Sequence, residues 1–149
     1  MKEISMSKFY SRAKIYFEHA KSDYTKIDID TCYLDSCCFL LQQSLEFLIK
    51  GAVDLLELDY SENYDIRTNL NILNQRHIDI PLLKEINRNI NMLYIWKNDS
   101  RCKESFTAAV KDIEEVMAIV KSLFEYVEAR MKKRELTEIE FPSHKLSDT

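Results

Sequence analysis

Three polar residues recur at a spacing that could place them on one face of a helix. Gln43, Glu46 and Lys50 stand at positions i, i+3 and i+7, and residues so spaced project from the same side of a helix. Glu46 and Lys50 also form a favourable i,i+4 pair, which stabilises an exposed helix by about 0.2–0.5 kcal/mol. Two interpretations stay open: a polar strip that orients a cation across a groove, or an ordinary solvated helix face.

Arg101 is the residue best suited to bind an anion. It follows Asp99 and Ser100 at a point where a helix is expected to begin. A guanidinium can grip a phosphate through two parallel hydrogen bonds, and the free N–H groups of a helix N-terminus add further donors. The alternative is an arginine that pairs with Asp99 or with Glu46 and has only a structural role.

Aromatic and basic residues surround Arg101 in the sequence. Tyr94 and Trp96 could stack on a base, as aromatic side chains do in nucleic-acid sites, or they could belong to the core. Lys97, Arg101 and Lys103 form a small basic cluster, which fits either phosphate binding or an ordinary charged surface. The candidate ligand-binding or phosphate-binding residues are Arg101, Lys50, Glu46, Gln43, Tyr94 and Lys97.

No complete catalytic motif or metal site is visible. His19, His77 and His144 are far apart, and no two of them have metal-ligand spacing. A single glycine excludes both a Gly-rich phosphate loop and a nucleophile elbow. Cys37 and Cys38 are adjacent, so on a helix they point about 100° apart. We therefore expect plain buried or half-buried thiols, no disulfide, no metal, no cofactor and no catalytic residue.

The bulk composition points to helices. The chain has 149 residues, of which 46% are hydrophobic and 31% charged, an ordinary balance for one globular domain. One glycine and two prolines are too few for the tight turns of a β-sandwich or barrel. The net charge of −4 gives no general basic footprint for nucleic acid. With no signal peptide and no apolar run near the ~18–20 residues that span a bilayer, we expect a cytoplasmic protein.

Apolar residues at helical spacing predict five helices. We expect them at about residues 7–26, 32–58, 68–76, 79–96 and 103–134. In the fourth, Asp79 is expected to cap the N-terminus, with Pro81 in the first turn. The second and fifth have the longest apolar stripes and should form the centre. The prediction is an all-α fold, an up-and-down bundle of four to five helices with one short extra helix.

Two further expectations concern the ends and the surface of this bundle. The helical domain should cover residues 1–135, and residues 136–149, where the periodicity is lost, should form a flexible tail. The apolar stripe of residues 32–58 is wider than one bundle face needs, which predicts a homodimer. Gly51 lies inside that helix and costs about 1 kcal/mol relative to Ala, so close helix packing is the expected compensation.

Several motifs, taken in order, resemble the HEPN domain family. Residues 36–51 resemble its signature helix, in which Gln43, Glu46 and Lys50 stand where the family has Gln, Glu and Lys. Residues 67–70 (Arg-Thr-Asn-Leu) resemble the start of a short helix that usually reads Thr-His-Asp-Leu. Tyr94 and Ser100-Arg101 then resemble an aromatic residue followed by Ser-Arg-Tyr. The likeness extends from about residue 7 to residue 131.

The resemblance implies a helical bundle that is commonly dimeric. Members of the family associate with minimal nucleotidyltransferases, bind nucleotides, or cut RNA as toxins. The cutting members use an Arg followed four to six residues later by a His, but no histidine lies between Arg101 and Ala108. The usual histidine of the short helix is also absent, because Thr68 takes its place.

The function indicated is therefore a non-catalytic HEPN-like module. It would dimerise and bind a nucleotide, a nucleic acid or a separately encoded minimal nucleotidyltransferase, in a setting such as a toxin–antitoxin or defence system. One alternative is a metal-independent ribonuclease toxin, which the missing histidine disfavours. A plainer alternative is a regulatory protein whose only role is protein–protein contact.

Overall fold

The computed structural model describes residues 2–56 and 65–140, with side chains described for residues 8–56 and 65–133. These residues form helices and no strands, which confirms the all-α fold class. The helices are α1 (Lys2–Tyr24), α2 (Cys32–Leu55), α3 (Ile66–Gln75), α4 (Leu83–Arg88), α5 (Ile90–Asp99) and α6 (Val110–Glu140).

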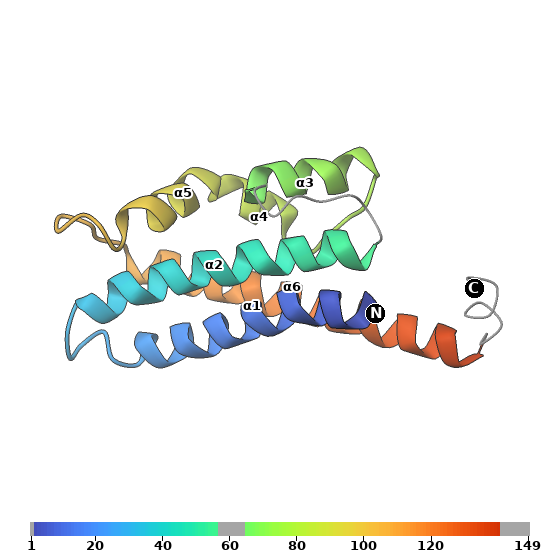
Figure 1. Cartoon of the computed structure of the whole chain (residues 1–149). Coiled ribbons are helices and arrows are strands. Elements are labelled where there is room, and N and C mark those ends of the chain that lie inside the picture. The colour runs from blue at the N-terminus through green and yellow to red at the C-terminus, as the bar shows by residue number, and fades with distance from the viewer. Residues whose placement is uncertain (1, 57–64, 141–149) are drawn as a thin grey trace.

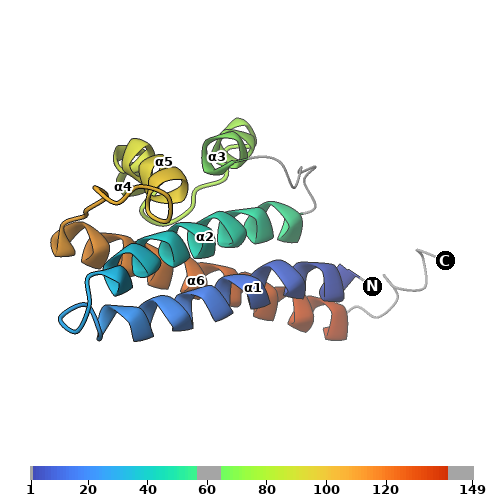
Figure 2. The ribbon, with the colours of Figure 1, turned by 60° about the vertical axis from the view of Figure 1, so that its left-hand side comes forward.

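Four helices run up and down beside one another. Along the chain, α1, α2, α5 and α6 alternate in direction, and the short helices α3 and α4 lie in the connection between α2 and α5 (Figure 1). Turned by 60°, the molecule shows α3, α4 and α5 on one side of α2, with α1 and α6 on the other (Figure 2). The expected up-and-down bundle with a short extra helix is confirmed.

Helix α2 lies at the centre because it packs against α1, α3, α5 and α6. Its fully buried side chains include Leu41, Leu45, Leu48 and Ile49. Four neighbours within one chain explain its broad apolar surface, so that surface by itself no longer calls for a second protomer. A β-carbon added at Gly51 would lie 3.6 Å from the Phe9 Cβ, an ordinary contact distance, so helix packing does not require glycine there.

Helix α6 closes the bundle by packing against α1 and α2. The Phe124 ring of α6 stacks on Phe17, with 5.5 Å between centroids, and meets the edge of Tyr10. The Tyr24 hydroxyl donates a 2.7 Å hydrogen bond to Glu114, and the Tyr10 hydroxyl donates to Glu128. The expectation that this long helix is central is met along Ile113–Val127, whose inward residues are buried.

The prediction of one continuous helix over residues 79–96 is wrong, because this segment starts later and forms two helices, α4 and α5. Leu82 has a left-handed backbone conformation, with φ of 59°, so the helix begins at Leu83 and Asp79 does not cap it. Asn89 then separates α4 from α5. Its side-chain amide donates to the backbone oxygen of Glu85 at 2.8 Å and to Glu115 at 2.6 Å. Such side-chain bonds compete with the helical backbone ladder.

The boundaries around the last loop are also corrected. Lys97 lies in the last turn of α5, and α6 begins only at Val110, seven residues later than expected. Ala109, just before α6, and Val110, its first residue, are exposed. Helix α6 reaches Glu140, so the first residues of the expected tail are helical, and residues 141–149 lie outside the described residues.

Candidate functional site

The polar strip of α2 is buried rather than solvated. Glu46 and Lys50 are only 6% and 4% exposed, and Gln43 is half-buried. The interpretation of these residues as an ordinary solvated helix face is therefore wrong. Gln42, which the sequence reasoning passed over, is 2% exposed. The signal for it was present, because Gln42, Glu46 and Lys50 repeat every four residues along one face.

Glu46 is the centre of a hydrogen-bonded charge network. Its carboxylate pairs with the Lys50 ammonium at 3.4 Å on the same helix and with the Lys97 ammonium of α5 at 2.9 Å. The Gln42 amide donates to Glu46 at 3.1 Å, and Gln43 donates to Gln42 at 2.6 Å. A buried carboxylate needs such partners to offset its lost hydration. The network ties the last turn of α5 to the middle of α2.

Tyr94 connects α5 to the start of α3. Its hydroxyl donates to Asp65, and Asp65 also caps α3 by accepting from the Thr68 N–H at 2.8 Å. Burial, followed by the bond to Asp65, raises the pKa of Tyr94 to about 12. Burial alone would raise the pKa of Asp65, but the bonds from Tyr94 and Thr68 outweigh it, so this pKa is lowered. The Arg67 guanidinium carbon lies 5.4 Å from the Tyr94 ring centre.

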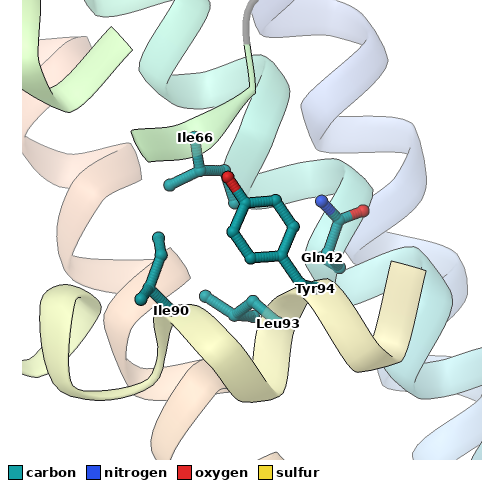
Figure 3. Close-up of a pocket in the computed structure, with 5 residues that line it drawn as sticks. All are labelled: Gln42, Ile66, Ile90, Leu93 and Tyr94. Carbon is teal, nitrogen blue, oxygen red and sulfur yellow. The ribbon is translucent and has the colours of Figure 1, made fainter. Parts of the chain in front are cut away.

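A small hollow lies where α2, α3 and α5 meet. Figure 3 shows Tyr94, Leu93 and Ile90 of α5 facing Ile66 of α3 and Gln42 of α2 across a small hollow. This hollow has no room for a water molecule. The hollow is therefore filled by the side chains around it, and the Glu46 network lies beside it on α2.

Arg101 is exposed and has no anionic partner among the residues whose side chains are described. Both carboxylates that the sequence suggested are taken by lysines: Asp99 pairs with Lys103 at 3.4 Å, and Glu46 pairs with Lys97. The guanidinium carbon of Arg101 instead lies 3.7 Å from the ring centre of Phe39 on α2. Because Arg101 follows the end of α5 and precedes α6 by nine residues, no helix N-terminus supports it, contrary to expectation.

Tyr94 and Lys97 of α5 and Arg101 in the turn after it make up a group of residues that we call the α5 face. Tyr94 and Lys97 stand three residues apart, so both project from one side of α5. Tyr94 is half-buried, the Lys97 side chain is 36% exposed and Arg101 is exposed. Trp96 points elsewhere and is 1% exposed, so its interpretation as a core residue is confirmed. The α5 face is thus a row of two cations beside an aromatic ring.

An open apolar hollow lies on another side of α5. It measures about 470 Å³, and its lining residues are Met92, Ile95, Trp96, Thr107, Ala108, Ala109 and Asp112. Ile95, which lines the hollow, and Val110, which follows the lining residue Ala109 in the chain, are 51% and 44% exposed.

The structure brings no histidine to Arg101 among the residues it describes. His19 lies on an exposed part of α1, and His77 lies in the turn after α3. That turn and the loop of residues 100–109 lie at opposite ends of the molecule (Figure 1). His144 lies outside the described residues. Glu104, which is exposed, is the one conventional base in the described loop 100–109.

The cysteines divide into two pairs by environment. Cys37 and Cys38 are fully buried, and burial raises the pKa of both thiols, that of Cys37 to about 12. Cys32 and Cys102 are exposed, which differs from the expectation of buried or half-buried thiols. Among the side chains described, those of residues 8–56 and 65–133, no three His, Cys, Asp or Glu gather as metal ligands.

The chain was compared with protein families, with curated proteins and with solved structures, and the family comparison found a match. None of the helices in the described ranges is long and apolar enough to cross a membrane. Neither a curated protein nor a solved structure matches the chain. The sequence does match the HEPN domain family over residues 6–130, from the first helix almost to the end of the described part of α6. This chain therefore belongs to the HEPN domain family.

Proposed function

We propose that this chain is a non-catalytic HEPN module that dimerises and binds a phosphate-bearing ligand, either a nucleotide or a single strand of RNA. The ligand binds on the α5 face, where the Arg101 and Lys97 side chains meet its phosphate oxygens. The module works beside a separately encoded minimal nucleotidyltransferase, as members of its family do, in a toxin–antitoxin or defence setting.

The observation that carries the proposal is the free guanidinium of Arg101. Among the described residues its contact is with the Phe39 ring, while the nearby acids are bound by Lys97 and Lys103. A guanidinium has five N–H donors and binds phosphate bidentately. Lys97 stands four residues earlier, in the last turn of α5, and its side chain reaches solvent. Two adjacent cations suit a phosphate better than a neutral ligand.

Dimerisation is proposed on different grounds from those in the sequence. Ile95 and Val110 are exposed beside the apolar hollow of α5 and the start of α6, and exposed apolar patches of this kind mark protein–protein contacts. We expect Ile95→Glu to shift the sedimentation coefficient from dimer to monomer at micromolar concentration. Ile15→Glu on α1, where the isoleucine is 54% exposed, serves as the matched control. Equal sedimentation coefficients for Ile95→Glu and Ile15→Glu would show that the hollow beside α5 is not the dimer interface.

Ribonuclease activity is the disfavoured alternative. Metal-independent cleavage needs a general base to take the 2′-OH proton, a role worth ~10²–10⁴-fold. A guanidinium does not act as a general base, and the one carboxylate in the described loop 100–109 is that of the exposed Glu104. Labelled RNA incubated with the protein, with and without a chelator, should stay intact. Cleavage that disappears in Arg101→Ala would replace the binding proposal with the nuclease one.

The ligand test compares two phosphate sources with one set of variants. ADP is titrated by calorimetry, and a short fluorescein-labelled single-stranded RNA by fluorescence anisotropy. Arg101→Ala should weaken binding of the true ligand class about 10-fold or more, since a charge-assisted bidentate contact is worth about 1.5–3 kcal/mol. Lys84→Ala, an exposed lysine of α4, is the charge-matched control. Equal affinity of the wild type and Arg101→Ala for both probes would reject the proposal.

The partner test uses co-purification. A minimal nucleotidyltransferase encoded next to this chain should co-elute with it in size-exclusion chromatography when the two are expressed together. Separate elution of the two proteins at micromolar concentration would leave the ligand-binding proposal intact and reject the partner.

A further inference from the structure

The contact between Arg101 and Phe39 differs from the other cation–aromatic contacts of the described residues. Its distance of 3.7 Å compares with 4.8–5.7 Å for the rest. A guanidinium that stood upright at 3.7 Å would press its nitrogen atoms into the ring. The group therefore lies flat on the ring of Phe39, in the stacked arrangement that arginine adopts on aromatic faces.

Phe39 belongs to the same side of α2 as the buried charge network. It stands seven residues before Glu46, so the two side chains project from one face of the helix. Glu46 pairs with Lys97 in the last turn of α5, and Phe39 contacts Arg101 four residues later, in the turn after α5. The two cations of the α5 face are thus each fixed by a different residue of α2, one through charge and one through an aromatic ring.

A flat guanidinium on a ring is organised to bind an oxyanion. Stacking uses the π-face of the group and leaves its N–H donors pointing outward in the plane, where two of them match two oxygens of a phosphate. An exposed arginine otherwise samples many rotamers, and a ligand must remove part of that freedom on binding. The ring contact removes some of that freedom before the ligand arrives.

We infer that Phe39 is the positioning residue of the phosphate site, holding Arg101 flat so that its fork of N–H groups receives two non-bridging oxygens of one phosphate. The inference rests on the proposed function of the α5 face. The ligand must then contain a phosphate whose two non-bridging oxygens can both accept hydrogen bonds from Arg101. Arginine is also needed at position 101, because a lysine has no planar group to stack or to bind bidentately.

The test is a double-mutant cycle with ADP and the labelled RNA as probes. Phe39→Leu keeps an apolar side chain but removes the ring, and Arg101→Lys keeps the charge but removes the fork. Each single change should weaken binding about 3- to 10-fold, as expected for about 1 kcal/mol. The double variant should bind about as well as the weaker single variant, because the ring matters only when the arginine lies on it.

Phe47→Leu is the control for general damage to α2. The Phe47 ring packs against Phe9 and Tyr16 of α1 rather than against Arg101, and its contacts with Lys50 and Arg12 are longer, at 5.4 and 5.7 Å. This variant should lose thermal stability yet bind both probes like the wild type. A loss of binding in Phe47→Leu equal to that in Phe39→Leu would overturn the inference, because the effect would then be structural.

A readout without ligand completes the test. The side-chain N–H and Cδ–H protons of Arg101 should show upfield NMR shifts from the ring current of Phe39, and Phe39→Leu should return them to ordinary positions. Ordinary shifts in the wild type would overturn the inference. Weaker binding in Arg101→Ala with unchanged binding in Phe39→Leu would also overturn it while leaving the proposed function standing. Unchanged binding in Arg101→Ala would reject both.

Discussion

Glu46 of α2 and Lys97 of α5 form an ion pair across the boundary between the two sides of the bundle, with 2.9 Å between the carboxylate oxygen and the ammonium nitrogen. The Glu46 side chain is 7% exposed and the Lys97 side chain 36%. One end of the pair is thus in the core and the other reaches solvent. A residue of the family's signature helix therefore supports the α5 face from within.

Removing the charge of Glu46 should destabilise the fold. In Glu46→Gln the ammonium groups of Lys50 and Lys97 lose a buried carboxylate, and breaking a buried pair costs about 3–5 kcal/mol. We expect about 2 kcal/mol, because Lys97 can turn toward water. Urea denaturation measures the loss. Glu18→Gln, which breaks an exposed pair with Lys21, should change stability by about 0.5 kcal/mol or less. Equal losses in the two variants would contradict the buried network.

Gly51→Ala should stabilise the protein. Glycine in a helix interior is about 1 kcal/mol less favourable than alanine, and the new β-carbon would meet Phe9 Cβ at an ordinary 3.6 Å. The expected gain is about 0.5–1 kcal/mol in urea denaturation, with ligand binding unchanged. A loss of stability would mean that α1 and α2 pack more tightly than this distance indicates.

Tyr94→Phe should weaken the attachment of α3 to α5. The variant removes the hydroxyl that donates to Asp65, at a cost of about 1 kcal/mol for a half-buried bond to a charged group. Because the pKa of Asp65 is lowered in the folded protein, this stabilisation is present above pH 3.8 and is lost as pH falls through the folded-state pKa.

The predicted pH dependence is measured by urea denaturation of the wild type and of Tyr94→Phe, at pH 7 and in steps below pH 4. The stability difference should shrink in the acid range. Tyr33→Phe, in a tyrosine whose ring contacts Lys26, provides the control. A difference that stays constant down to pH 2 would show that the lost bond is not coupled to the Asp65 carboxylate.

The four thiols should react in two classes. Cys102 and Cys32 are exposed, whereas Cys37 and Cys38 are fully buried with raised thiol pKa values. An aromatic disulfide reagent at pH 8 should label Cys102 and Cys32 in the native protein and the other two only in urea. Cys32 should be the slower of the exposed pair, since its bond and charge interaction with Asp30 raise its pKa. Native labelling of all four would contradict the packing of α1 on α2.

Local sequence patterns were sufficient to predict the helices. Helical hydrogen bonds join residues four apart, so apolar spacing and the shortage of glycine and proline predicted an all-α bundle with α2 at its centre. The ends of elements were less predictable. The turn at Leu82 and the break at Asn89 depend on backbone conformation and on a side-chain bond to Glu115 of α6, which no local pattern contains.

For the candidate site too, the sequence predicted the residues, and the tertiary structure decided their surroundings. The sequence alone identified Gln43, Glu46 and Lys50 as polar residues at helical spacing, and Tyr94, Lys97 and Arg101 as aromatic and basic residues close together in the chain. Only the tertiary structure decided that Glu46 and Lys50 are buried, that Lys97 reaches Glu46, and that Arg101 lies on Phe39. Burial and pairing depend on which helices become neighbours, and Phe39 and Arg101 meet only because α2 and α5 pack side by side in opposite directions (Figure 1).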